Sequence, residues 1–424
     1  MYEINNDGQL HHMDIIMNIL FLTIAYDSAR NIYSDLMNEF RDNGHIVYVV
    51  CQTEWRDNLN TYLHNENGIN ILQVKTGNLT GKVSIIEKGL ATLSIDYLFK
   101  RAISTYIPDV KFDLVIYSTP PITLYNVVKY IRKRDGAGTY LLLKDIFPQN
   151  AVDLGLIREN GFVHNFFRRK EKKLYCISDY IGCMSVANRQ YLIAHNSDID
   201  SNRIEVNPNS IRPLTCRECE KNHIMEIRKK YGIPGNATLF IYGGNLGLPQ
   251  GLEFLIDICR EIKNRENIFL LIVGDGSRYD FISAELTQIG AANVKLFKKF
   301  SKAEYDELLT VCDVGLIFLS PRFTIPNFPS RLTAYMEMGL PILAATDTIT
   351  DIKDILSDAN CGFWSKNGDL NSFVKNMEKL VEDNDLRHQM GQNGRIYLEE
   401  HYTVDKSYQI IMRHFAKMEE TTNV

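Results

Sequence analysis

The sequence predicts an α/β protein built from two Rossmann-like domains that face each other. Short apolar segments of strand length alternate with amphipathic segments of helical period nearly throughout, which favours parallel sheets covered by helices. This alternation stops at a stretch rich in proline and asparagine, residues 206–213, and starts again beyond it. A chain of 424 residues is also too long for a single hydrophobic core.

The first half of the chain contains six predicted strands. Apolar runs bounded by turn residues mark them at residues 19–25, 46–51, 71–74, 114–118, 140–144 and 180–184. Residues 29–43 and 121–134 have the apolar spacing of helices, and each is followed by a glycine, the usual residue beyond a helix C-terminus. We expect residues 17–212 to form the N-terminal domain. Residues 1–12 are polar, and we expect residues 1–16 to be disordered or an extension ahead of the true start.

The second half repeats the pattern with five predicted strands. They lie at residues 238–242, 268–273, 294–297, 314–319 and 342–345. A polar connector over residues 215–230 precedes them. We expect residues 213–403 to form the C-terminal domain, and residues 404–424 to contain a final helix.

Composition excludes several classes of protein. With 45% hydrophobic and 23% charged residues the chain is a globular protein, and its net charge of −5 argues against nucleic acid as a partner. No run of about 18 apolar residues could span a membrane. The eight cysteines are scattered, as in reduced cytoplasmic proteins, and the pair Cys216 and Cys219 lacks the further ligands of a zinc site. We therefore expect no metal and a cytoplasmic location.

The most informative motif is PNFPSRLTAYMEMGLP, residues 326–341. A proline-bounded loop leads into a short helix, which Gly339 and Pro341 end. A helix N-terminus offers unpaired N–H groups to a phosphate or a sugar hydroxyl. Ser330 can cap this helix, and Arg331 adds a cation. The plainer interpretation is an ordinary loop–helix–strand turn of an α/β protein.

This motif resembles the donor-site helix of glycosyltransferase family 4, the retaining sugar-nucleotide transferases with the GT-B fold. The resemblance extends over residues 17–420. It implies that the N-terminal domain binds an acceptor, that the C-terminal domain binds a nucleotide sugar, and that the last helix crosses back onto the N-terminal domain. By this resemblance the motif's donor-binding residues are Asn327, Phe328, Pro329, Ser330 and Arg331.

Two glycine-rich loops resemble further parts of the family's donor site. The sequence GGNLGLPQGL, residues 243–252, follows a strand and opens a helix, where glycines let the backbone approach a pyrophosphate. Its expected donor contacts are Gly243, Gly244, Asn245, Gln250 and Gly251. The second loop, Gly274, Asp275 and Gly276, resembles the loop beneath the nucleobase, although a simple tight turn explains it equally well.

The chain departs from the family pattern at four positions. The family usually has arginine where Asn245 stands and lysine where Gln250 stands, and these cations neutralise the diphosphate. Its two signature glutamates correspond to Pro326 and Ala334, which cannot bond a ribose.

Other residues are expected to replace the missing groups. Glu337, one helical turn beyond Ala334, is the candidate for the ribose contact, unless it is a solvated carboxylate. Arg322 and Arg331 are the candidates for the diphosphate, with Lys298 and Lys299 as second choices.

These departures have two interpretations. The patterns GNLGLPQGL and PNFPSR resemble the N-acetylfucosaminyl-type transferases of O-antigen and capsule biosynthesis. Alternatively, the chain is an inactive copy of the fold that binds or scaffolds. Two matching departures in one chain favour a coordinated, active site. A third candidate, an epimerase of the same fold, would need a cluster of carboxylates and histidines that we do not find.

In the first domain the expected site lies at the ends of two strands. The segment KDIFPQ, residues 144–149, closes one strand and resembles the family's segment at the rim of the inter-domain cleft. A carboxylate at the carboxyl end of a parallel strand lies where α/β proteins bind ligands. Asp145 is thus the candidate to orient or deprotonate the acceptor hydroxyl, or to hold the geometry of the cleft. The expected neighbours in the cleft are Ser118, Thr119, Pro120, Pro148 and Gln149.

One basic stretch interleaves aromatic residues, from Phe162 to Tyr175. A basic amphipathic helix of this kind can lie on an anionic membrane, and an ordinary surface helix is the alternative. Taken together, the resemblance implies a retaining transferase that moves an N-acetylamino-deoxyhexose or N-acetylhexosamine from a UDP-sugar to a lipid-linked saccharide, without a cofactor. We expect it in the cytoplasm, where peripheral attachment to the inner face of the cell membrane is one option.

Overall fold

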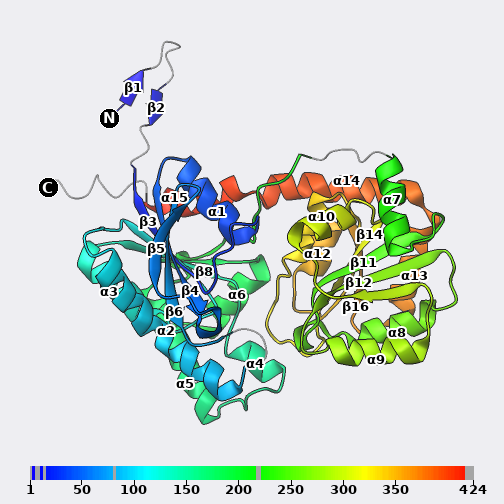
Figure 1. The fold of residues 1–424 in the computed structure, drawn as a ribbon, viewed down its shortest axis with the longest axis horizontal. Helices are drawn as coiled ribbons and strands as arrows, with labels where there is room; N and C mark the ends of the chain where they lie inside the picture. Colours follow the sequence, from blue (N-terminus) through cyan, green and yellow to red (C-terminus); the bar gives the residue numbers. More distant parts are fainter. Residues whose placement is uncertain (1, 5–9, 13–15, 80–82, 216–220, 416–424) are drawn as a thin grey trace.

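The computed structural model describes residues 2–4, 10–12, 16–79, 83–215 and 221–415. Two lobes are visible in Figure 1, one formed by β3–β10 with α1–α6 and the other by β11–β16 with α7–α13. Within the expected N-terminal extension, β1 (Tyr2–Ile4) and β2 (Leu10–His12) pair antiparallel. The remainder of that extension and the pair Cys216 and Cys219 lie outside the described residues.

The N-terminal domain contains an eight-stranded sheet in the order β10-β9-β8-β7-β3-β4-β6-β5. All neighbours in this sheet are parallel except β5 and β6. The strands are β3 (Asn18–Leu22), β4 (Ile46–Glu54), β5 (Tyr62–Glu66), β6 (Ile69–Thr76), β7 (Leu114–Ser118), β8 (Gly138–Leu143), β9 (Tyr180–Cys183) and β10 (Ile204–Val206). Every residue of β7 and β8 is buried, because helices cover both faces of the sheet. These helices are α1 (Ile32–Asp42), α2 (Ile85–Tyr106), α3 (Tyr125–Asp135), α4 (Gln149–Asp153), α5 (Phe162–Ile177) and α6 (Val186–His195).

The C-terminal domain is a second Rossmann-like unit. Its six strands are all parallel, in the order β13-β12-β11-β14-β15-β16. They are β11 (Thr238–Asn245), β12 (Ile268–Asp275), β13 (Val294–Phe297), β14 (Val314–Phe318), β15 (Ile342–Thr346) and β16 (Gly362–Lys366). The helices are α7 (Lys221–Tyr231), α8 (Glu253–Ile262), α9 (Tyr279–Ile289), α10 (Lys302–Leu309), α11 (Arg331–Glu337), α12 (Ile352–Asp358) and α13 (Leu370–Glu382).

The last two helices join the domains. Figure 1 shows α14 (Asn384–His401) running from the C-terminal lobe towards the other lobe, where α15 (Val404–Phe415) lies beside α1. Ile411 and Phe415 are buried in the same hydrophobic cluster as Ile19 and Phe40 of the N-terminal sheet and α1. The final helix therefore packs on the N-terminal domain, as the sequence predicts.

Within the two domains, four elements differ from the sequence-based expectations. Strands β5, β10 and β16 were not predicted, because β5 is largely polar, β10 has three residues and β16 carries only two bulky apolar residues. Helix α7 occupies most of the segment that the sequence presents as a polar connector. Within the described residues, every helix is too short or too polar to cross a membrane.

Candidate donor and acceptor sites

The two glycine-rich loops meet at the carboxyl ends of β11 and β12. Gly244 pairs with Gly274, and Asn245 with Asp275. A Cβ on Gly274 would lie 1.9 Å from the carbonyl oxygen of Gly244, so only glycine allows this approach. Gly276 has a φ of +158° and lies against the Leu246 carbonyl. These two predicted loops therefore form one continuous backbone surface.

Arg331 lies against this surface. Its guanidinium stacks on the ring of Tyr242, with the carbon 4.6 Å from the ring centroid. Its Nη2 is 3.2 Å from where a Cβ on Gly244 would lie. The Nη1 atom is buried and has no hydrogen-bond partner. None of the ion pairs among the described residues involves Arg331. A buried cation without a counter-charge is costly, and an anionic ligand would compensate it.

Two further tyrosines fix the loop above Arg331. The backbone N–H of Gly243 donates to Tyr335 Oη at 3.2 Å, and that hydroxyl donates to the Ile241 carbonyl at 3.3 Å. A Cβ on Gly243 would lie 1.8 Å from Tyr305 Oη, which excludes any larger residue. Burial raises the pKa of Tyr335 to about 12, so this tyrosine stays neutral and supplies no counter-charge to the arginine. Sequence analysis assigned no role to either tyrosine, although Tyr335 lies within the motif over residues 326–341.

Asn245 and Gln250 face each other across the turn that follows β11. The Asn245 amide donates to Gln250 Oε1 at 3.4 Å. At the two positions where the resembled family usually carries cations, this protein therefore has a neutral amide pair. Ser330 was expected to cap α11, but its side chain makes no capping hydrogen bond, and its backbone already has helical angles.

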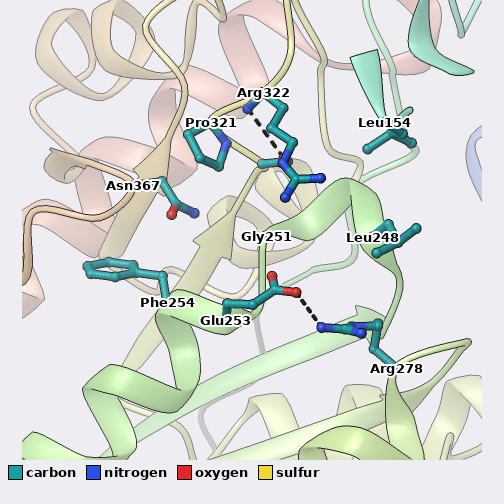
Figure 2. A pocket seen from close by; sticks show the side chains of 10 residues that line it. Leu154, Leu248, Gly251, Glu253, Phe254, Arg278, Pro321, Arg322 and Asn367 are labelled. Atoms are coloured by element: carbon teal, nitrogen blue, oxygen red, sulfur yellow. Dashed lines mark hydrogen bonds and ion pairs between the residues drawn. The ribbon is translucent and has the colours of Figure 1, made fainter. Parts of the chain in front are cut away.

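A pocket of about 380 Å³ lies between the start of α8 and the segment after β14 (Figure 2). Two of its lining residues, Gly251 and Arg322, were predicted as donor contacts. The lining that sequence analysis missed includes Arg278, which pairs with Glu253 and stacks on Phe281, its guanidinium carbon 4.2 Å from the ring centroid. The only available signal was its position two residues beyond the Gly-Asp-Gly loop.

Glu337 does not lie free for a ribose. Its two oxygens accept hydrogen bonds from Nη1 and Nη2 of Arg30 in the N-terminal domain, each at 2.5 Å. The Leu214 N–H donates to Oε1 at 2.8 Å, and the side chain is 2% exposed. The structure thus shows Glu337 in a contact between the domains and gives no support to the predicted ribose contact or to the alternative of a solvated carboxylate.

Asp145 lies just beyond the carboxyl end of β8 in the N-terminal sheet. Thr119 Oγ1 accepts the N–H of Asp145 at 3.2 Å and donates to its carbonyl at 3.0 Å. Asn150 Nδ2 donates to the carboxylate at 2.6 Å. Burial raises the pKa of Asp145 to about 6, and that of the neighbouring Lys144 falls to about 7 for the same reason. Asp145 therefore has a pKa suited to proton transfer near neutral pH.

The other predicted cleft residues surround this strand end. Ser118 and Thr119 are buried at the end of β7, and Pro120 follows them on the surface. Pro148 precedes α4, in which Gln149 donates to Asp153 at 2.9 Å. These residues lie together at the carboxyl ends of β7 and β8.

Short contacts join this edge to the C-terminal domain. Asp153 accepts the N–H of Thr324 at 2.7 Å. Asn188 Nδ2 donates to the Pro326 carbonyl at 2.7 Å, and Asn209 Nδ2 contacts the Phe328 carbonyl at 3.5 Å. The predicted donor residues Asn327, Phe328 and Pro329 therefore lie on the segment that meets the N-terminal domain. The structure brings both predicted sites to one inter-domain region.

Comparisons with known proteins agree with this architecture. Residues 223–397 match the family model described as Glycosyl transferases group 1. The probable glycosyltransferase WbjE of Pseudomonas aeruginosa is 24% identical over 308 residues, which cover 72% of this chain and 74% of WbjE. The putative colanic acid biosynthesis glycosyl transferase WcaI of Escherichia coli (strain K12) is 22% identical over 263 residues, covering 60% of this chain and 64% of WcaI. The chain thus spans less than two thirds of WcaI.

A solved structure of similar architecture is that of Anabaena Alr3699/HepE in complex with UDP and glucose. It has a TM-score of 0.69 at 16% sequence identity and covers 95% of this chain and 100% of that chain. At this identity the likeness establishes the fold alone. The architecture is the GT-B fold, and the family match and the relatives together identify the protein as a glycosyltransferase enzyme of that fold.

Proposed function

We propose that the protein transfers a sugar from a UDP-sugar to a lipid-linked saccharide in cell-surface polysaccharide biosynthesis, with retention of the anomeric configuration. The observation that carries this proposal is the guanidinium of Arg331 beside the glycine-rich surface, whose buried Nη1 atom has no hydrogen-bond partner. The name of WcaI refers to colanic acid biosynthesis, and the HepE structure contains UDP and glucose, which supports this donor and this pathway class.

In this proposal the chemistry needs no enzyme nucleophile. Arg331 and the loop N–H groups stabilise the charge that develops on the leaving diphosphate. The departing phosphate takes the proton of the incoming hydroxyl, and Asp145 orients that hydroxyl or assists its deprotonation. The contacts between the domains exclude water and limit hydrolysis of the donor.

The sugar in this proposal is an N-acetylamino-deoxyhexose or an N-acetylhexosamine. The support is the resemblance of GNLGLPQGL and PNFPSR to the N-acetylfucosaminyl-type transferases. The amide pair of Asn245 and Gln250 also supports this proposal. The two neutral side chains that stand in place of the family's cations are hydrogen-bonded to each other. The competing proposal of an inactive scaffold predicts donor binding without turnover.

Replacing Arg331 by alanine should weaken UDP binding by about 1.5 to 3 kcal/mol, the range for hydrogen bonds to a charged group. Isothermal titration with EDTA present measures this and tests the proposal that no metal is required. Uridine, which lacks phosphates, should bind the variant and the wild type alike. Arg260→Ala, an exposed arginine on α8, is the control. Equal losses for UDP and uridine, or binding that requires magnesium, would contradict the proposed diphosphate site.

We further propose that α5 docks the enzyme on an anionic membrane. One face of α5 is buried and carries His164, Glu171, Leu174 and Tyr175. An ordinary surface helix would have such a buried face as well. Its first residue, Phe162, is nevertheless 88% exposed. Beside the helix, a groove of about 480 Å³ towards α3 is lined by three cations, Lys129, Arg132 and Lys133. An exposed phenylalanine at the start of the helix and clustered cations beside its end suit an anionic lipid surface.

Removing two charges from α5 should weaken vesicle binding about 30-fold, since each cation near the surface contributes about 1 kcal/mol. The variant is Arg169→Ala with Lys173→Ala, both exposed. Co-sedimentation with vesicles containing 30% phosphatidylglycerol measures the effect, and pure phosphatidylcholine is the reference. Lys366→Ala with Lys375→Ala removes the same charge from the other domain and should change little. Equal effects of the two double variants would contradict docking through α5.

A further inference from the structure

We propose that the pocket between α8 and the segment after β14 binds an anionic group of the acceptor, a phosphate or a carboxylate. This inference rests on the proposed function for the identity of the acceptor. It separates the two arginines that the sequence assigns jointly to the donor diphosphate: Arg331 remains with the donor, and Arg322 serves the acceptor.

The charge of the pocket is carried by Arg322. Three of the ten lining residues are ionisable at neutral pH: Glu253, Arg278 and Arg322. Glu253 and Arg278 neutralise each other in an ion pair at the rim, drawn as a dashed line in Figure 2. Arg322 is exposed, takes part in none of the ion pairs among the described residues, and points its guanidinium into the pocket (Figure 2). The pocket therefore presents one uncompensated positive charge, which an anion can pair.

The walls of the pocket suit a bulky organic anion better than a free ion. Leu248, Phe254 and Pro321 supply apolar surface around the guanidinium. Asn367 also lines the pocket, and its amide donates to the Leu319 carbonyl at 2.9 Å and is thereby fixed. Apolar walls with a small number of placed polar groups are typical of small-molecule sites.

The position of the pocket points to the acceptor. Leu154 of the N-terminal domain contributes to the lining, although the other lining residues come from the C-terminal domain. Next to it, Asp153 accepts from Thr324, two residues beyond Arg322. The pocket thus opens at the edge where the acceptor domain meets the donor domain. Arg331 instead lies against Gly244, at the ends of β11 and β12.

The test is a titration of anions into the enzyme saturated with UDP, so that the donor site is filled. The probes are inorganic pyrophosphate for the phosphate group and glucuronate for the carboxylate. We expect one of them to bind the wild type, and Arg322→Gln to weaken that binding about 10- to 100-fold. Arg322→Lys should restore part of it. Arg260→Gln, an arginine on α8 outside the lining, should bind like the wild type.

The two probes distinguish the source of the anion, since pyrophosphate alone indicates the lipid phosphate and glucuronate alone indicates an acidic sugar. A UDP-loaded wild type that binds neither probe overturns the proposal. A loss of UDP affinity in Arg322→Gln equal to that in Arg331→Ala also overturns it, because both arginines would then serve the donor. If UDP itself fails to bind the wild type, the donor assignment fails. In that case pyrophosphate is titrated into the unliganded enzyme and its variants. A loss of pyrophosphate affinity in Arg322→Gln supports the proposed pocket, and an affinity equal to that of the wild type overturns it.

Discussion

Asp145→Asn should lower turnover by about 10²- to 10⁴-fold, the usual contribution of a positioned acid–base or orienting group. The substitution keeps the size of the side chain, and its amide oxygen can still accept the hydrogen bond from Asn150. UDP affinity should stay near that of the wild type, because Asp145 lies on the other domain from the Arg331 site. Turnover onto a membrane-extracted acceptor, with UDP binding measured in parallel, is the assay.

The pH dependence gives a second readout of the same residue. Burial raises the pKa of Asp145 to about 6, so its carboxylate becomes protonated as the pH falls through 6. Wild-type turnover should decline as the pH falls through 6. The residual turnover of Asp145→Asn should stay constant over the same pH range. The raised pKa also means that the ionised group destabilises the folded state above pH 6 relative to a neutral one. The variant should therefore be at least as stable as the wild type at pH 8.

An exposed carboxylate provides the control for this prediction. Asp198 is 49% exposed and makes only a long ion pair, with Lys172 at 3.5 Å. Asp198→Asn should change neither turnover nor its pH profile. Unchanged turnover in Asp145→Asn would contradict a role of Asp145 in the reaction. A wild type that binds UDP but turns over no acceptor in a broad panel would favour the scaffold proposal.

The fold was predictable because local signals carry it. Apolar runs of strand length mark eleven strands, and the restart beyond residue 213 separates the two sheets. What the sequence did not indicate are elements without such a run, such as β5 with its polar residues His64, Asn65 and Glu66. A strand of this kind forms because β6 offers it a free edge, and that edge exists only in the folded sheet.

The parts of the candidate site that lie within one segment of the sequence were predictable. The contacts that form between distant segments were not. The loops Gly243–Asn245 and Gly274–Gly276 were identified separately, and the structure joins them through the pairing of β11 and β12. The tyrosines around Arg331 come from three different elements, so no motif collects them. Glu337 illustrates the limit best: its partner Arg30 is 307 residues away, and helix periodicity alone indicates neither this partner nor the burial.

That ion pair links the two domains through the helix that carries Arg331. Arg331 begins α11 and Glu337 ends it, seven residues in all. Glu337 accepts two hydrogen bonds from Arg30, which also donates to the Arg212 carbonyl at 2.9 Å. A displacement of Glu337 therefore moves the helix on which Arg331 is mounted, and through it the proposed diphosphate site.

Arg30→Ala should destabilise the protein by about 3 to 5 kcal/mol, because it leaves the buried carboxylate of Glu337 without its cation. Urea unfolding measures this loss. Glu337→Ala should cost less, since Arg30 is 21% exposed and keeps its bond to the Arg212 carbonyl. Arg30→Met with Glu337→Met should recover much of the stability, because a buried pair can be exchanged for apolar side chains of similar size.

UDP affinity separates a local loss of stability from a coupling between the domains. If the pair holds α11 in place, Arg30→Ala should also weaken UDP binding, although Arg30 belongs to the other domain from the glycine-rich loops. The partly exposed pair of Arg212 and Glu39 in the N-terminal domain, with side chains 45% and 16% exposed, is the comparison. Breaking it with Glu39→Ala should cost about 1 kcal/mol or less and leave UDP binding unchanged. Additive losses for Arg30→Ala and Glu337→Ala would mean that the two side chains act independently, and the link between domain contact and donor site would not hold.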